Sequence, residues 1–311
     1  MKVHHSIKNF TEKKRLTILT IGTFDGVHIG HQKIIERLNQ IKVTIEGKSA
    51  ILTFFPHPRR VLNKKNELKM LTTIDEKIQL LKNLGLDHLI IEPFTEEFSQ
   101  LSAKEFVENI LVDRLRIKTL VIGYDHQFGK NREGDFKQLQ KYGEAFDFKL
   151  ESIPAQDIDN VAISSTKIRN AVNEGDILKA NSFLGYNYLL TGEVVKGKGL
   201  GRKIKFPTIN IQINEDYKLI PKTGVYIVQT SIENSIVYGI MNIGYRPTIN
   251  GKTQTIEVHL IDFQEDLYGK KIQIEILNRL RDEQKFDSLV SLTQQIQKDE
   301  ILARKWLETQ N

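Results

Sequence analysis

The stretch LTILTIGTFDGVHIGHQKIIERL, residues 16–38, decides how this chain is interpreted. Its first part, residues 16–22, is an apolar run typical of a buried strand that ends at glycine. The run HQKIIERLNQIKV, residues 31–43, has the apolar spacing of a helix. Ligands bind beside strand-to-helix turns of open parallel sheets, and the free amides of a helix N-terminus attract phosphate. The turn therefore predicts an anion site on an α/β fold.

The alternation of strand and helix continues downstream. Further strands are expected at residues 49–55, 86–94 and 117–123, and helices at 73–85 and at 102–115, the latter with Ser102 as N-cap. Such alternation implies right-handed crossovers and a doubly wound parallel sheet. The strands are almost entirely apolar, as expected for a sheet covered on both faces.

The pattern changes near residue 185. Short β-rich runs separated by turns follow, among which Asn250-Gly251 is a hairpin dipeptide, and residues 286–308 have a helical period. This half predicts an antiparallel sheet or small barrel with a terminal helix. We place the domain boundary so that residues 1–184 form the first domain and residues 185–311 the second.

Composition narrows the class of protein. The chain has 311 residues, 40% of them hydrophobic, and no cysteine, which excludes disulfides and thiolate metal sites and suits a reducing cytoplasm. Neither a signal-like N-terminus nor a run long enough to span a membrane is found, so we expect a cytoplasmic protein. The net charge of +6 suits phosphorylated small molecules as well as nucleic acid, and equally an ordinary solvated surface.

The turn in residues 22–31 carries two histidines among glycines. His28 and His31 are three residues apart, so they share one face of a first helical turn and can both donate hydrogen bonds to phosphate. Gly22, Gly26 and Gly30 allow close approach of the backbone to a ligand. The alternative is that His28 caps the turn and His31 is an ordinary surface residue. A zinc site fits less well, because the spacing is wrong and no third ligand is evident.

Two further segments have features of phosphate sites. Ser164, Ser165 and Thr166 precede a helical run with Arg169 in its first turn, although a plain N-cap with a solvent-facing arginine explains this too. The second segment, residues 194–211, is a basic loop rich in glycine, or else simply a flexible hairpin. Its candidate phosphate-wrapping residues are Gly197, Gly199, Gly201 and Arg202.

The strand candidates after this loop offer polar groups. Thr208 and Asn210 are two residues apart, share one side of a strand, and offer neutral oxygens that suit Mg²⁺ with nucleotide phosphates. In residues 256–260, Glu257 lies on the polar side of an alternating strand. It is either a general base for an alcohol or simply the solvated side of that strand.

Several of these motifs together resemble one family. The segments GTFDGVHIGHQKII, TFFPHP, VIGYDHQFGKNREGD, ISSTKIR and FPTIN follow one another as in the bacterial bifunctional riboflavin kinase/FAD synthetases, and the likeness runs from about residue 16 onward. Within them, H-I-G-H resembles the H-x-G-H signature of nucleotidyltransferases. The resemblance implies that the second domain phosphorylates riboflavin to FMN with ATP and that the first joins FMN to AMP from ATP, giving FAD and pyrophosphate.

The resemblance also implies residue roles. For adenylyl transfer, the catalytic residues are His28, His31 and Arg169, with Asp125 near flavin or nucleotide. ATP is then held by Gly22, Phe24, Gly30, Ser164, Ser165 and Thr166. For the kinase, Glu257 is the base, the glycine loop with Arg202 binds ATP, Mg²⁺ sits on Thr208 and Asn210, and Arg281 holds flavin unless it simply lies on a helix surface.

Two other hypotheses stay open. One is that only one half is active and the other is regulatory. The other is a nucleic-acid-binding protein, which would need a basic patch with exposed aromatics. Charges alternate in sign in the second half, and the single tryptophan, Trp306, lies in the terminal helical run, so we expect riboflavin, FMN and ATP as partners and neither nucleic acid nor membrane.

Overall fold

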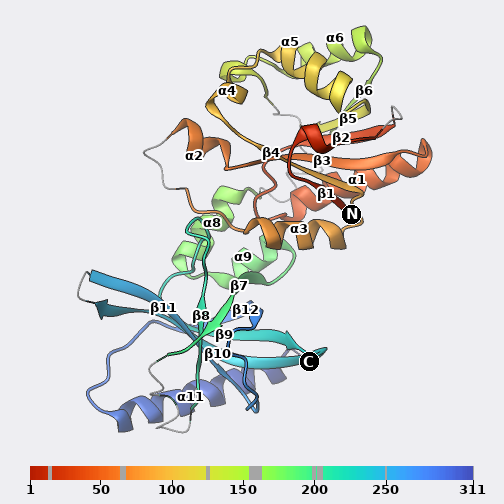
Figure 1. Ribbon diagram of the computed structural model, residues 1–311. Helices are drawn as coiled ribbons and strands as arrows, with labels where there is room; N and C mark the ends of the chain where they lie inside the picture. The colour runs from red at the N-terminus through yellow and green to blue at the C-terminus, as the bar shows by residue number, and fades with distance from the viewer. Residues whose placement is uncertain are drawn as a thin grey trace. The chain divides into compact units, whose positions relative to one another are not determined.

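The chain forms two compact units, Met1–Ser165 and Thr166–Asn311 (Figure 1). The computed structural model describes residues 1–12, 16–63, 68–123, 127–153, 163–197, 201, 206–248 and 251–310. The division between the units falls inside helix α8 (Ser165–Glu174). The change of sequence pattern comes later, where helix α9 (Ile177–Leu184) ends at a left-handed Gly185.

The first unit is built on a six-stranded parallel sheet, as predicted. Its spatial order is β1-β4-β3-β2-β5-β6. The strands are β1 (Lys2–His4), β2 (Thr17–Ile21), β3 (Lys48–Phe55), β4 (His88–Pro93), β5 (Ile117–Gly123) and β6 (Lys149–Ile153). The chain moves outward from β2 to β4 on one side and then returns to β5 on the other. The direction of winding therefore reverses beside β2, which is where open sheets of this kind bind ligands.

Helices cover both faces of this sheet because alternate strand residues point to opposite sides. One buried cluster joins Ile18 and Ile51 to Leu38 of α1 (Ile29–Thr44) and Leu81 of α3 (Ile74–Asn83). The other face packs on Phe106 and neighbouring residues. The remaining elements of this unit are η1 (Ile7–Asn9), α2 (Pro58–Leu62), α4 (Glu96–Ser99), α5 (Ala103–Glu105), the π-helix η2 (Phe106–Arg114), η3 (Lys130–Arg132) and α6 (Phe136–Phe146).

The predicted N-cap at Ser102 is confirmed. Its hydroxyl accepts from the Glu105 N–H, and the Glu105 carboxylate accepts from the Ser102 N–H, so the two form a capping box. Beyond this first turn the expected helix continues as the π-helix η2.

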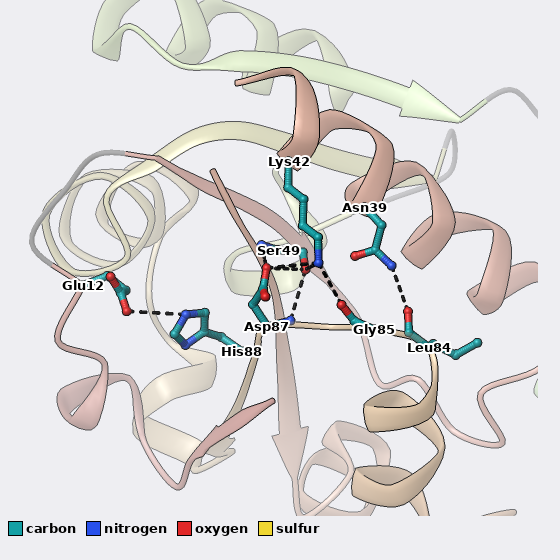
Figure 2. Close-up of polar contacts among 8 residues, drawn as sticks. All are labelled: Glu12, Asn39, Lys42, Ser49, Leu84, Gly85, Asp87 and His88. Atoms are coloured by element: carbon teal, nitrogen blue, oxygen red, sulfur yellow. Dashed lines mark hydrogen bonds and ion pairs between the residues drawn. The ribbon is translucent and has the colours of Figure 1, made fainter. Parts of the chain in front are cut away.

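A polar network fastens the amino ends of β3 and β4. Figure 2 shows Lys42 of α1 beside Asp87, with 3.2 Å between the ammonium and a carboxylate oxygen. The same carboxylate accepts from the Ser49 N–H, and the Asp87 N–H donates back to the Ser49 hydroxyl. Next to it, His88 lies 3.5 Å from a Glu12 carboxylate oxygen. The network ties α1 to the sheet at the end opposite to the predicted site.

The second unit contains a closed antiparallel barrel, in the order β10-β11-β8-β7-β12-β9. Its strands are β7 (Tyr188–Val195), β8 (Ile209–Gln212), β9 (Gly224–Ile232), β10 (Ser235–Thr248), β11 (Gly251–Leu260) and β12 (Lys271–Arg281). The terminal helix α11 (Leu289–Glu308) packs Ala303 and Trp306 against Val225 and Ile227. The predicted barrel and terminal helix are thus confirmed, while Asn250 of the hairpin dipeptide lies outside the described residues.

Candidate active sites

The turn after β2 is strained and tightly held. Phe24 has φ 47° and Val27 has φ 37°, a left-handed conformation that side chains rarely adopt, and Gly26 between them has φ 80°. A Cβ at Gly22 would come within 3.1 Å of the Phe24 ring. Such a turn persists only where the surroundings over-determine it.

Asp25 supplies much of this constraint. Its carboxylate is fully buried and accepts hydrogen bonds from the Leu71 N–H at 3.0 Å and the Thr72 N–H at 3.2 Å. The Thr72 hydroxyl in turn accepts from the Gly26 N–H. The turn is therefore bonded to the segment that leads into α3.

The two histidines lie together at the start of α1. Their rings stack with centroids 3.7 Å apart, and the Phe24 ring also packs against His31, with 4.7 Å between the ring centroids. His28 is the N-cap residue of α1, but its side chain makes no capping hydrogen bond, so the capping alternative does not describe it. The Nδ1 atom of His31 is buried and has no hydrogen-bond partner within the described part of the chain. Gly30, the second residue of α1, is also buried, so the histidine pair sits where the helix amides are unpaired.

A buried lysine, Lys77, acts electrostatically on His31. Lys77 of α3 is 2% exposed, and its ammonium donates to the Thr23 carbonyl at 2.7 Å. Burial lowers the pKa of Lys77 to about 8, although Asp25 opposes this shift. Burial, then His28 and then Lys77 hold the pKa of His31 well below its usual value. Burial thus disfavours the charged forms of both side chains, and a nearby anion would favour them.

The second predicted phosphate segment contributes one contact to this turn. The Ser165 hydroxyl donates to the Asp25 carbonyl at 3.0 Å, and Ser164 precedes it on the surface. Thr166 and Arg169 follow on α8 and belong to the second compact unit. Asp125 lies outside the described residues.

In the barrel, the predicted kinase residues fall on one register row. Glu257 of β11 is the Cα partner of Asn210 on β8 and of Asn242 on β10. Asn242 pairs with Val225 on β9, which pairs with Arg281 on β12. Directly paired residues project from the same side of a sheet. The barrel therefore brings Asn210, Glu257 and Arg281 to one side.

The alternation predicted for β11 is confirmed. Ile256, Val258 and Leu260 are buried, whereas Glu257 and His259 are partly exposed. Asn210 and Asn242, the register partners of Glu257, carry neutral amide side chains. Such amides can hydrogen-bond a substrate without taking its proton.

Gly197, near the beginning of the predicted glycine loop, lies next to Asn210 of this row. A Cβ on Gly197 would lie only 2.1 Å from Asn210 Nδ2, so the absence of a side chain there leaves room for the amide. Gly201 is equally enclosed, with the Phe206 carbonyl 2.2 Å from where its Cβ would stand. Thr208 precedes β8 next to Pro207, whose carbonyl is 2.9 Å from His259 Nδ1. Gly199 and Arg202 lie outside the described residues.

Arg281 ends a strand, so the helix-surface alternative for it is wrong. Its guanidinium contacts the Asp299 carboxylate of α11 at 2.7 Å and 2.9 Å, and Asp299 is almost fully buried. This forked pair fixes the direction of the arginine at the end of the register row.

Comparisons with known proteins identify the family. A family model described as FAD synthetase matches residues 10–167, and one described as riboflavin kinase matches residues 184–307. A curated relative from Listeria monocytogenes, named bifunctional riboflavin kinase/FMN adenylyltransferase, is 39% identical over 96% of this chain and 95% of its own. The chain belongs to this family.

Other relatives carry the same name. The protein from Bacillus subtilis is 38% identical over 95% of this chain and 93% of its own, and that from Escherichia coli K12 is 37% identical over 98% of each. A crystal structure described as a macrolide-efflux protein from Streptococcus pneumoniae is similar, with TM-score 0.88 and 29% identity over 98% of this chain and 99% of that one. In the described part of this chain, no helix has the length and apolar character to cross a membrane.

Sequence reasoning missed three residues that these sites use. Asp25 lies within the quoted turn but gave no sign of being buried. Lys77 occupies an inner helical position, three residues after Ile74 and four before Leu81, and a lysine in such a stripe is the signal that was available. Asn242 is recognisable only from the strand register.

Proposed function

We propose that the family's two activities, FMN adenylyltransferase and riboflavin kinase, use two separate centres in this chain. The first is the histidine turn after β2, in residues 1–184, and the second is the Glu257 row of the barrel, in residues 185–311. The observation that carries the proposal is that each centre groups the residues that its own reaction needs. ATP is the donor in both reactions, and this fits the cytoplasmic location that we expect.

For adenylyl transfer, a phosphate oxygen of FMN attacks the α-phosphorus of ATP, and the bond to the bridging oxygen breaks to release pyrophosphate. The nucleophile is already an anion, so no general base is needed. His28 and His31 donate to the phosphates at the start of α1, and the helix amides add to them. In this proposal Ser164, Ser165, Thr166 and Arg169 hold the leaving pyrophosphate, and Gly22, Phe24 and Gly30 shape the turn.

For the kinase, the 5′-hydroxyl of riboflavin attacks the γ-phosphorus of ATP, and ADP leaves. A neutral alcohol is a poor nucleophile, so Glu257 accepts its proton as the bond to phosphorus forms. In this proposal Arg281, whose direction is fixed by Asp299, binds the flavin at the end of the row.

The kinase centre fits a magnesium ion. No group of three acidic, histidine or cysteine side chains suited to a metal occurs among the described residues. A cation there would instead use the Asn210 amide oxygen, for which Gly197 leaves room, and the Thr208 hydroxyl, with nucleotide phosphates as further ligands. When bound, Mg²⁺ neutralises charge that develops on the transferred phosphoryl group.

The test is a pair of variants in the full chain, His28→Ala and Glu257→Gln. We expect His28→Ala to lower FAD formation from FMN by about 100- to 1000-fold while riboflavin phosphorylation stays within about twofold. Glu257→Gln is expected to do the reverse. The measurement is chromatographic separation of flavins after incubation with ATP and Mg²⁺, starting from riboflavin and, separately, from FMN.

The outcomes separate the alternatives. If both activities fall together in a folded variant, the centres are not separate. If wild-type protein carries out only one reaction, the other half has a regulatory role instead.

A further inference from the structure

We propose that Lys77 is a positioning residue for adenylyl transfer, because it fixes the turn that presents the two histidines and places a positive charge near His31. The inference rests on the proposed role of the His28 turn. It concerns a residue that touches neither nucleotide nor flavin in this account and acts through Thr23 and His31.

Geometry gives the first argument. The Thr23 carbonyl accepts from Lys77 Nζ at 2.7 Å and from the Thr53 hydroxyl at 3.1 Å. Thr23 is followed directly by the left-handed Phe24, whose ring packs against His31. A shift of the carbonyl therefore moves the aromatic ring on which the histidine rests.

Charge gives the second argument. A lysine is costly to bury, and here Asp25, which stabilises its charged form, also accepts hydrogen bonds from the Leu71 and Thr72 N–H groups and so compensates the ammonium only in part. A methionine of similar length would fill the same space without that cost. Retaining an ammonium there is reasonable only if a further negative charge arrives, and a nucleotide triphosphate on the histidines supplies it.

The titratable groups around the Lys77 ammonium determine the pH at which it loses its charge. The groups that face it are Asp25 from the turn and His31 from α1, which stacks on His28. On its own helix, the Glu76 carboxylate accepts from the Thr73 N–H. Since the pKa of Lys77 is about 8, the free enzyme loses this charge above that pH. The phosphates of both substrates are fully ionised there and contribute no step of their own.

The experiment compares Lys77→Met with Thr53→Val in the full-length protein. Thr53→Val removes the other hydrogen bond to the same Thr23 carbonyl but no charge, so it reports simple loosening of the turn. We expect Lys77→Met to lower kcat/KM for ATP in FMN adenylyl transfer by about 10- to 100-fold, and Thr53→Val by at most about fivefold. Riboflavin kinase activity, measured on the same samples, is expected to stay within about twofold for both.

The dependence of kcat/KM on pH distinguishes an effect of the Lys77 charge from an effect of side-chain packing. In wild type and in Thr53→Val, kcat/KM for ATP should fall above pH about 8, whereas Lys77→Met should have no such limb. The pKa of His31, followed by NMR, should rise in Lys77→Met only, because one of the causes that lowers it is then removed.

Two results would overturn the inference. One is a wild-type profile that is flat through pH 8 to 10, and the other is equal losses in the two variants with the limb retained. If His28→Ala keeps full adenylyl transfer, the proposed site itself fails. If His28→Ala is inactive and Lys77→Met is unaffected, only the role of Lys77 fails.

Discussion

Each end of the parallel sheet contains a lysine and an aspartate beside a histidine, but the lysine and the aspartate are arranged differently at the two ends. At the amino end, Lys42 and Asp87 are partly exposed and paired directly at 3.2 Å (Figure 2). At the carboxyl end, Lys77 and Asp25 are buried, and each bonds mainly to backbone groups.

The pKa directions express this difference. Burial opposes ionisation of Asp87, but the Ser49 N–H and the Lys42 ammonium overcome it, so the pKa of Asp87 lies below its ordinary value. Burial lowers the pKa of the histidine at both ends, His88 and His31, so the difference at the carboxyl end lies in the lysine, because burial lowers the pKa of Lys77 to about 8. At the amino end the opposite charges are paired within the protein, whereas at the carboxyl end the proposed anion would supply further negative charge.

The largest expected effect is that of Asp25→Asn. It leaves the Lys77 ammonium buried without a carboxylate and presents an amide to backbone N–H donors. We expect a loss of about 3–5 kcal/mol in the stability of the first unit. Amide hydrogen exchange of β2 measures this directly, since the tryptophan reporter lies in the other unit. A loss below about 1 kcal/mol would mean that the buried aspartate at the carboxyl end contributes no more to stability than the partly exposed one at the amino end.

The pH dependence of stability comes next. The pKa of Lys77 is about 8 when folded and about 10.5 when unfolded, so the unfolded chain binds more protons between these values. Stability of the first unit should therefore rise with pH across that window, by about 3 kcal/mol in total, and Lys77→Met should lack this rise. The comparison is made by hydrogen exchange corrected for intrinsic rates. Curves of stability against pH that run parallel in the two proteins would contradict a lowered pKa for Lys77.

The smallest effect is expected for Asp87→Asn at the amino end. The pair with Lys42 is partly solvated, so we expect a loss of about 0.5–1 kcal/mol at pH 7. Because the folded pKa of Asp87 is depressed, this contribution is present above the unfolded pKa and disappears as pH falls through the folded one. Wild type and variant should therefore converge in acid, and a difference that persists there would point to packing instead.

The fold was largely predictable from the sequence, because apolar runs and helical periods are local. The run at residues 16–22 became β2, and the change near residue 185 corresponds to the start of the barrel. The strand β1 was missed, since its three residues carry no pattern and pair only through β4. The π-helix η2 was expected as an ordinary helix, because its apolar spacing does not distinguish the two.

The candidate sites divide in the same way. His28 and His31 were found because residues three apart on a helix are neighbours by local geometry. The row that joins Glu257 to Asn242 depends on the register of separate strands, which no local pattern carries. The buried state of Asp25 and Lys77 likewise depends on packing between segments about 50 residues apart in the chain, which no local pattern carries.

The most direct test of the account is whether ATP binding at the carboxyl end of the sheet takes up protons. Calorimetric titration of the full chain with ATP at pH 8, without flavin and in buffers of different ionisation enthalpy, gives the number of protons bound. This pH is close to the pKa of Lys77 in the free protein, so a fraction of the Lys77 side chains is uncharged, and a bound triphosphate should restore their charge. We predict a net uptake of less than one proton per protein in wild type that is absent from Lys77→Met. Equal uptake in the two proteins, or none in wild type, would contradict the claim that this end of the sheet awaits an anion.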